Sequence, residues 1–185
     1  DGFVCYMVGR MILETCATVE EAIELVKSVP HRGAFSYNVL DRHGKTFVIE
    51  AGPRAVEVRE ANVCTNHFDI LTEENRRYLK DSLERKHVIE ENRNQLIEPE
   101  AAFQFFNDSE AGVFADKYKS WAGTIHTSLY LPNEMEVWFT LGGDRDPVVF
   151  DAKKWFTGED IPLQRMYGDV DTDLGFANMD AKLRT

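Results

Sequence analysis

The sequence contains no apolar run close to the ~20 residues that a membrane-spanning helix requires. Positive charge is also scarce, because 21 Lys and Arg stand against 32 Asp and Glu and the net charge is −11. Nucleic acids and anionic lipid surfaces are bound through clusters of Lys and Arg. We therefore expect neither a nucleic acid nor a membrane as a partner. No signal peptide is visible at residues 1–8, so a cytoplasmic location is expected.

The sequence has too few cysteines for a disulfide framework, and it has no pair of histidines spaced for a metal site. The three cysteines, Cys5, Cys16 and Cys64, are odd in number and widely spaced. The sequence has no Cys-x-x-Cys, and its five histidines form no pair at the spacing of metal ligands. The two glycines at residues 142–143 precede an Asp, whereas a phosphate-binding loop needs a Lys. We expect no metal and no cofactor.

The chain does contain enough hydrophobic sequence for one globular domain, with 185 residues of which 43% are hydrophobic. Thr18 and Glu21 form a capping box, and the apolar residues that follow repeat at helical spacing. This pattern predicts a helix that ends at Pro30. Residues 1–8 are typical of a strand, and residues 11–16 are typical of a short helix.

Alternating apolar and polar residues elsewhere predict antiparallel strands joined by short turns. Turn residues at 41–44 and 52–53 separate the first of these strands. After residue 157 the alternation is lost. We therefore expect one domain over residues 1–157 and a tail over residues 158–185 that wraps the surface or meets a partner. The strands are expected at residues 35–40, 46–50, 55–59, 61–64, 121–131, 135–141 and 147–150.

A long helix rich in Glu, Lys and Arg is expected over residues 72–94. On such a helix Tyr78, Ser82, Arg85 and Ile89 share one face. Two polar residues on this otherwise apolar face have two interpretations. Arg85 either serves a pocket or runs along the edge of the apolar stripe with its charge in water.

The densest group of reactive side chains is at residues 63–68, where the last strand of the first series meets this helix. Asn66 has an amide that can donate to an anion formed during acyl transfer, and one such donor lowers the barrier by about 3–4 kcal/mol. Arg85 carries a permanent charge that can organise the pocket. The alternative is that Asn66 only caps a turn. A Cys64–His67 nucleophilic pair is a further alternative, although catalytic Cys and His usually come from separate elements.

A series of short segments carries a family resemblance. The segments lie at residues 10–14, 18–23, 36–38, 48–50, 64–68, 82–85 and 123–128. They include Thr-Asn-His at residues 65–67 and Ser-x-x-Arg at residues 82–85. In order and spacing they resemble the C-terminal part of the penicillin acyltransferase-like and choloylglycine hydrolase-like amidases. The resemblance covers roughly residues 1–145.

This resemblance implies an N-terminal nucleophile hydrolase, an α+β protein with an αββα sandwich of antiparallel sheets. It implies cleavage of a linear amide C–N bond, or acyl transfer, by an N-terminal Cys whose own α-amino group acts as base. The substrate would be a small-molecule amide or acyl compound. The family's roles carry over onto Asn66 in the oxyanion hole and onto Arg85 beside the nucleophile. The residues expected to line the substrate are Tyr37, Asn38, His67 and Ser82.

The nucleophile of that family has no counterpart in Cys5, Cys16 or Cys64, because it belongs upstream of Asp1. We therefore expect a chain that is incomplete at its N-terminus and that needs the missing N-terminal nucleophile segment as a partner. Sheet edges exposed by such a gap favour association, so a homo-oligomer is also expected. The alternative function is a non-catalytic binding or assembly module derived from the same fold.

Overall fold

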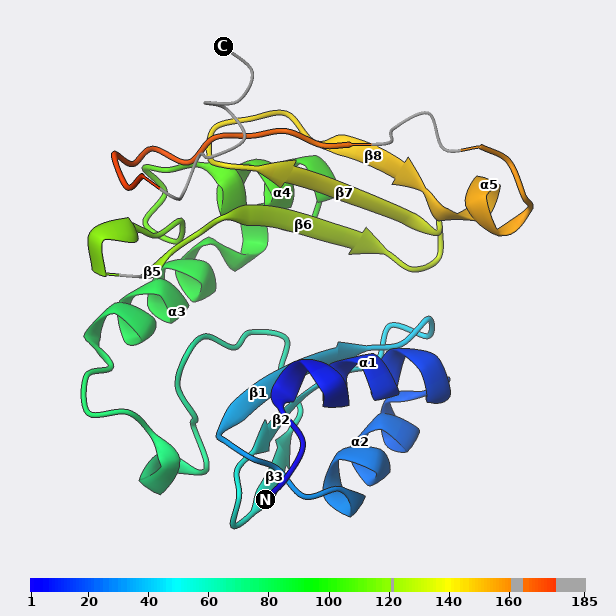
Figure 1. Ribbon diagram of the computed structural model, residues 1–185, viewed down its shortest axis with the longest axis vertical. Helices are drawn as coiled ribbons and strands as arrows, with labels where there is room; N and C mark the ends of the chain where they lie inside the picture. Colours follow the sequence, from blue (N-terminus) through cyan, green and yellow to red (C-terminus); the bar gives the residue numbers. More distant parts are fainter. Residues whose placement is uncertain (121, 161–164, 176–185) are drawn as a thin grey trace. The chain divides into compact units, whose positions relative to one another are not determined.

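The computed structural model describes residues 1–120, 122–160 and 165–175. It shows an α+β fold with antiparallel sheets, as the sequence predicted (Figure 1). The chain forms two compact units, Asp1–Glu90 and Glu91–Thr185. The boundary at residue 157 between a domain and a tail stays a prediction.

The first unit is built on a three-stranded antiparallel sheet in the order β1-β2-β3. Its strands are β1 (Phe35–Leu40), β2 (Thr46–Ala51) and β3 (Val56–Arg59), which agree with the predicted ranges to within one residue at each end. The turn between β1 and β2 contains Gly44, whose φ of 79° lies in the left-handed region that glycine adopts without strain.

Two helices, α1 (Cys5–Thr15) and α2 (Val19–Ser28), cover one face of this sheet (Figure 1). The predicted capping box starts α2, because the side chain of Thr18 accepts a hydrogen bond from the N–H of Glu21 at 3.3 Å. The carboxylate of Glu21 reaches back to the N–H of Ala17, one residue before Thr18, at 2.6 Å. The buried core between helices and sheet consists of Val8, Val26, Tyr37, Ile49 and Ala51.

The strand predicted at residues 1–8 is wrong. Phe3 forms a single bridge to another segment, and α1 already begins at Cys5. Cys5, Val8 and Ile12 follow one another at helical spacing and pack together against the core. Burial of this helical face therefore outweighs the strand preference of the local sequence.

The helix predicted over residues 72–94 is interrupted. A short 3-10 turn, η1 (Thr72–Glu74), is followed by its C-cap residue Asn75, and α3 spans only Lys80–Asn92. The side chain of Asn75 accepts from the N–H of Phe68 at 2.7 Å and donates to the carbonyl of Phe68 at 2.8 Å. A side chain that is bonded to the backbone of another segment competes with helix formation at its own position.

The strand predicted at residues 61–64 is an irregular segment. Arg59 donates from Nη2 to the carbonyl of Val63 at 3.1 Å. Asn38 donates from Nδ2 to the carbonyl of Asn62 at 3.3 Å. Because side chains satisfy these carbonyl groups, the segment crosses the sheet without adding a strand to it.

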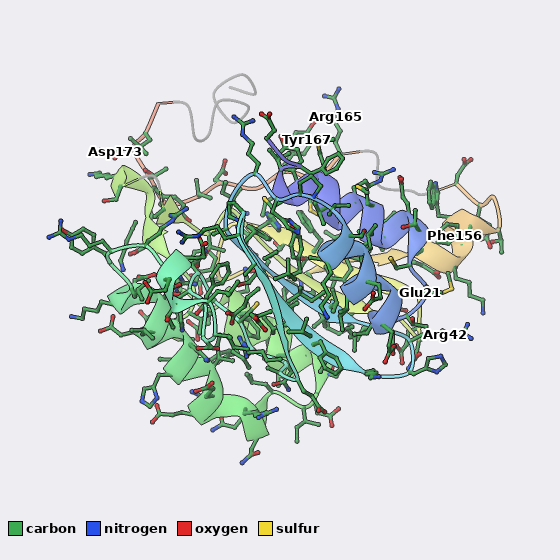
Figure 2. All side chains as sticks on the ribbon, turned by 90° about the horizontal axis from the view of Figure 1, so that it is seen from below. Glu21, Arg42, Phe156, Arg165, Tyr167 and Asp173 are labelled. Carbon is green, nitrogen blue, oxygen red and sulfur yellow. The ribbon has the colours of Figure 1, made fainter. Side chains whose placement is uncertain are left out.

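The second unit contains a three-stranded antiparallel sheet in the order β6-β7-β8 and a two-stranded sheet of β4 and β5. Phe103 is 2% exposed, and its ring meets the ring of Trp138 edge-on at 6.2 Å. Phe156 is the final residue of the last helix that the structure describes, and 69% of its surface is exposed (Figure 2). The elements are η2 (Arg93–Gln95), α4 (Pro99–Asn107), β4 (Asp116–Lys117), η3 (Tyr118–Ser120), β5 (Ala122–Gly123), β6 (His126–Leu131), β7 (Glu136–Leu141), β8 (Val148–Asp151) and α5 (Ala152–Phe156).

The hairpin predicted from residues 121–131 and 135–141 is present as β6 and β7. Its first strand is shorter than predicted because Thr124 is engaged elsewhere. The N–H of Thr124 donates to the carbonyl of Ala115 at 2.7 Å, and its hydroxyl accepts from the N–H of Ala115 at 3.0 Å. Trp121, with which the predicted strand began, lies outside the described residues.

Part of the predicted tail lies against the sheet of the second unit. A Cβ at Gly168 would come within 2.3 Å of the Cβ of Leu141, and a Cβ at Gly142 would come within 2.3 Å of the carbonyl oxygen of Asp169. Gly142 also has a φ of 83°. These close approaches require glycine. Among the helices that the structure describes, none combines the length and apolar character needed to cross a bilayer.

Candidate functional site

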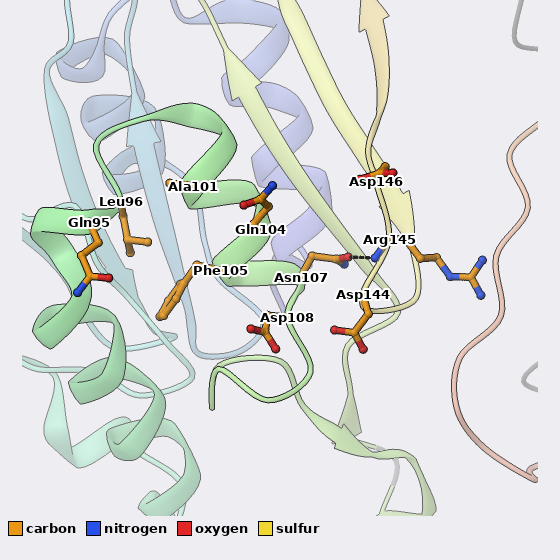
Figure 3. A pocket seen from close by; sticks show the side chains of 10 residues that line it. All are labelled: Gln95, Leu96, Ala101, Gln104, Phe105, Asn107, Asp108, Asp144, Arg145 and Asp146. Atoms are coloured by element: carbon orange, nitrogen blue, oxygen red, sulfur yellow. Dashed lines mark hydrogen bonds between the residues drawn. The ribbon is translucent and has the colours of Figure 1, made fainter.

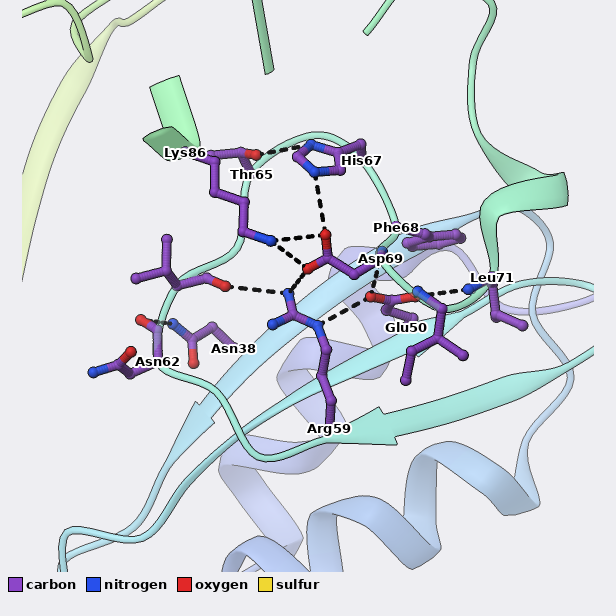
Figure 4. A network of polar contacts seen from close by, with 12 residues as sticks. Asn38, Glu50, Arg59, Asn62, Thr65, His67, Phe68, Asp69, Leu71 and Lys86 are labelled. Carbon is purple, nitrogen blue, oxygen red and sulfur yellow. Dashed lines mark hydrogen bonds and ion pairs between the residues drawn. The ribbon is translucent and has the colours of Figure 1, made fainter. Parts of the chain in front are cut away.

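The face of the first sheet opposite to α1 and α2 carries a buried acid, Glu50 on the central strand β2, with 0% of its surface exposed. Its carboxylate accepts hydrogen bonds from the successive N–H groups of Asp69, Ile70 and Leu71 at 2.8–2.9 Å (Figure 4). Burial acts to raise the pKa of Glu50, but these three bonds and the guanidinium of Arg59 outweigh it. The pKa therefore lies below its ordinary value of 4.5, and the group is ionised at neutral pH.

Arg59 joins this acid to the following loop. Its Nε donates to Oε1 of Glu50 at 3.1 Å, and its Nη2 lies 2.9 Å from Oδ2 of Asp69. Lys86 on α3 contacts both carboxylate oxygens of Asp69 at 2.6 and 2.7 Å. Burial acts to raise the pKa of Asp69, and Lys86 and Arg59 lower it to a net value below the ordinary one. We call these four residues the Glu50 cluster. Its opposite charges balance.

Hydrogen bonds made by hydroxyl groups and an imidazole connect residues 65–67, which we call the Thr-Asn-His corner, to α3. Thr65 donates from Oγ1 to the carbonyl of Ser82 at 2.9 Å. Nδ1 of His67 lies 2.8 Å from the hydroxyl of Ser82, and Nε2 of the same ring lies 3.4 Å from the carboxylate of Asp69. Both His67 and Ser82 are buried, with 6% and 5% exposure. The corner therefore has a fixed position relative to the helix that carries Arg85.

Asn66 and Arg85 meet directly on this corner. Nη2 of Arg85 donates to the side-chain oxygen Oδ1 of Asn66 at 2.7 Å, and Nε of Arg85 donates to Asp81 at 2.9 Å. A guanidinium group has donors only, so it fixes which end of the amide faces it. Within the part of the chain that the structure describes, Nδ2 of the exposed Asn66 donates no hydrogen bond. The amide hydrogens are thus turned away from Arg85 and can donate to another group.

Tyr37 and Asn38, the other two residues predicted to line the substrate, point to opposite faces of β1. Tyr37 is 7% exposed in the core, where its hydroxyl donates to the carbonyl of Cys5 at 3.2 Å. Burial, with a smaller effect from Cys5, raises the pKa of Tyr37 to about 12. Asn38 instead holds the carbonyl of Asn62, four residues before Asn66. The structure brings Asn66, Arg85, His67 and Ser82 together, and it separates Tyr37 from them.

The site lies within a segment that matches a known family. A family model described as acyl-coenzyme A:6-aminopenicillanic acid acyl-transferase matches residues 1–146. The chain belongs to this family. This match confirms the resemblance to the penicillin acyltransferase-like family that the sequence motifs indicated. No curated protein and no solved structure matches the chain.

Sequence reasoning missed the residues that position the site of this acyltransferase-family chain. Glu50 is one of 32 acidic residues, and the exposed Glu57 likewise stands between apolar residues of a strand. The available signal was its place between apolar residues of a strand, where a charge is unusual. Arg59 and Asp69 could be recognised only as partners of a buried acid.

The acyltransferase-family chain also has a hollow in its second unit, with a volume of about 440 Å³ (Figure 3). Asn107 at its base is 2% exposed and fully engaged, because it donates to Thr127 and to the carbonyl of Gly142 and accepts from the N–H of Arg145. Asp108, Asp144 and Asp146 give its lining an acidic character. Among the described residues, no group of three or more His, Cys, Asp or Glu side chains is arranged to hold a metal ion.

Cys64 is expected to be a poorly reactive thiol. Burial is the largest effect on it and raises its pKa above the ordinary 9.0, while the nearby charges of Arg59 and Asp69 oppose each other. The ring nitrogens of His67 face Ser82 and Asp69, so the geometry does not favour a Cys64–His67 pair. At pH 7 we expect iodoacetamide to modify Cys64 more slowly than a small free thiol, because only the thiolate reacts and burial raises the pKa of this thiol.

The measurement is peptide mass spectrometry after timed alkylation, repeated at pH 9, where the rate should rise. Cys16, which follows α1 and is half-buried, is the matched control within the same chain. Alkylation of Cys64 as fast as that of a small free thiol would contradict this prediction.

Proposed function

We propose that this chain is the C-terminal part of an enzyme that cleaves a linear amide C–N bond or transfers the acyl group to another acceptor. Its substrate is a small-molecule amide or acyl compound. The observation that carries the proposal is the contact between Arg85 and Asn66, because it fixes the side-chain oxygen of Asn66 and leaves Nδ2 directed outward as a donor.

Attack on an acyl carbon places negative charge on the carbonyl oxygen. A donor that is already oriented stabilises this charge without having to reorganise during the reaction, and its loss costs about 10²–10³ in kcat. Arg85 adds to the effect, because a cation bonded to Oδ1 polarises the amide and strengthens donation from Nδ2. Asp81 holds the guanidinium at Nε, which keeps Arg85 in the orientation that Asn66 requires.

The nucleophile in this proposal is an N-terminal Cys from a segment outside the chain, with its α-amino group as base. Cys5 lies at the start of α1, Cys16 is the residue that follows α1, and Cys64 has a raised pKa. Each of them is joined to the chain through its nitrogen, so none has a free α-amino group here. The αββα sandwich of the N-terminal nucleophile hydrolases belongs to the same proposal.

The test is the intact mass and N-terminal residue of the natural full-length protein, together with its turnover of simple N-acyl amides. We expect a processed species that begins with Cys and that releases or transfers the acyl group. The purified chain of residues 1–185 should show no turnover. Turnover by that chain that persists when Cys5, Cys16 and Cys64 are all replaced by Ala would overturn the proposal. A natural protein without a terminal Cys and without turnover would favour the binding or assembly module.

A further inference from the structure

Glu50 has an environment that its burial alone does not explain. An ionised carboxylate removed from water costs several kcal/mol unless charge and hydrogen bonds replace its hydration. Here the replacement is complete. Oε1 accepts from Nε of Arg59 and from the N–H of Asp69, and Oε2 accepts from the N–H groups of Ile70 and Leu71. A neutral side chain of the same shape cannot accept from all four donors.

These bonds lie on both sides of Asn66. Three residues before Asn66, the carbonyl of Val63 accepts from the same guanidinium that contacts Glu50. Three residues after Asn66, the N–H of Asp69 donates to the carboxylate of Glu50. The acid and its Arg59 partner therefore hold both ends of the short segment that carries Asn66.

We propose that Glu50 is a positioning residue for Asn66. Its buried carboxylate fixes the backbone after the oxyanion donor directly and, through its bond to Arg59, supports the backbone before that donor. This inference rests on the proposed function of Asn66. It gives a catalytic reason for placing a full charge at the centre of a sheet, where an apolar residue would pack without any desolvation cost.

The decisive variant is Glu50→Gln in the natural full-length protein. The Gln amide has one acceptor and one donor end, so either the Asp69 side or the Ile70 and Leu71 side must face an NH₂ group. The loop then shifts, and a misplacement of about 1 Å costs about 100-fold in rate. We expect kcat per active site to fall about 10- to 100-fold with KM changed less than about three-fold, since Asn66 acts mainly on the transition state.

Turnover is counted per active site by the burst of the first product, so that a smaller folded fraction cannot imitate the loss in kcat. Glu57→Gln is the matched control, because Glu57 pairs with Glu50 across β2 and β3 but is exposed. It should change neither kcat nor KM. Glu50→Asp keeps the charge and should recover part of the lost kcat. Equal kcat in Glu50→Gln and Glu57→Gln would overturn the role of Glu50.

Amide hydrogen exchange of the unaltered protein gives a second test that needs no variant. The N–H groups of Asp69, Ile70 and Leu71 should be protected at pH 7, although they belong to a loop. Fast exchange at all three positions would overturn the inference even if Glu50→Gln failed to fold. The outcomes also separate the two proposals: if Asn66→Ala abolishes turnover and Glu50→Gln does not, only the positioning role fails. If Asn66→Ala leaves turnover unchanged, the oxyanion role of Asn66 fails and the positioning role of Glu50 fails with it, whereas a natural protein without turnover fails the proposed function itself.

Discussion

Asn66→Ala is expected to lower kcat of the natural full-length protein by about 10²–10³-fold and to change KM little. In the proposed function, the amide that this substitution removes is the only group of the side chain that can donate to the developing oxyanion. Ground-state binding depends less on that bond, because the carbonyl oxygen of the substrate carries little charge before attack. The measurement is steady-state kinetics with an N-acyl amide substrate, with folding checked by circular dichroism.

Two further variants sharpen this prediction. Asn66→Asp should lose at least as much kcat, because a carboxylate accepts hydrogen bonds and repels the oxyanion. Asn62→Ala makes the same chemical change at an exposed position four residues earlier in the segment and should retain kcat within about three-fold. A folded Asn66→Ala protein with unchanged kcat would show that Asn66 is only a structural residue of the turn.

Arg59→Met is expected to lower the free energy of unfolding by about 3–5 kcal/mol at pH 7, the usual cost of breaking a buried ion pair. The change leaves Oε1 of Glu50 without its charged partner and removes one cation from Asp69. It also frees the carbonyl of Val63. Urea unfolding of the chain gives the measurement. Arg54→Met is the control, because the side chain of Arg54 is 72% exposed in its pair with Glu74. This substitution should lower the free energy of unfolding by less than about 1 kcal/mol.

The effect of Arg59→Met should shrink as the pH falls. In the unaltered chain the pKa values of Glu50 and Asp69 are lowered on folding, so their ionisation stabilises the folded state above their unfolded values. That contribution is lost as the pH falls through the folded pKa values. The variant lacks part of this contribution wherever the carboxylates are ionised, so the free energies of unfolding of the two chains should converge once the pH falls below the folded pKa values. A difference that does not shrink as the pH is lowered through the folded pKa values of Glu50 and Asp69 would mean that Arg59 stabilises through packing and not through charge.

The sequence determined the features of this protein that depend on neighbouring residues. The capping box at Thr18, the strands β1 to β3 and the hairpin of β6 and β7 follow from local hydrogen bonding and from alternation of apolar residues. The order of its short motifs also identified the family, which the match over residues 1–146 confirms. Asn66 and Arg85 were candidates from the same motifs.

Some helices and strands are stabilised mainly by contacts with residues distant in the chain, and only the tertiary structure shows where these elements begin and end. Residues 1–8 suit a strand by composition, yet α1 starts at Cys5 because a core contributed by α2 and the sheet is available to bury one of its faces. The helix predicted over residues 72–94 is interrupted because Asn75 bonds to Phe68. Local propensity differs between such alternatives by less than the burial or hydrogen bonding that a distant partner supplies.

The support of the site depends on tertiary structure in the same way. Glu50 lies 16 positions before Asn66 in the chain, and no local pattern distinguishes it from the exposed Glu57. Folding places the loop after Asn66 over β2, where three backbone N–H groups and Arg59 make an ionised carboxylate stable in a buried position. The sequence therefore predicted Asn66 and Arg85, whereas only the fold shows that Glu50 supports the loop after Asn66. The free energy of a buried charge depends on every hydrogen-bond donor around it, and the donors to Glu50 are distant from it in the chain.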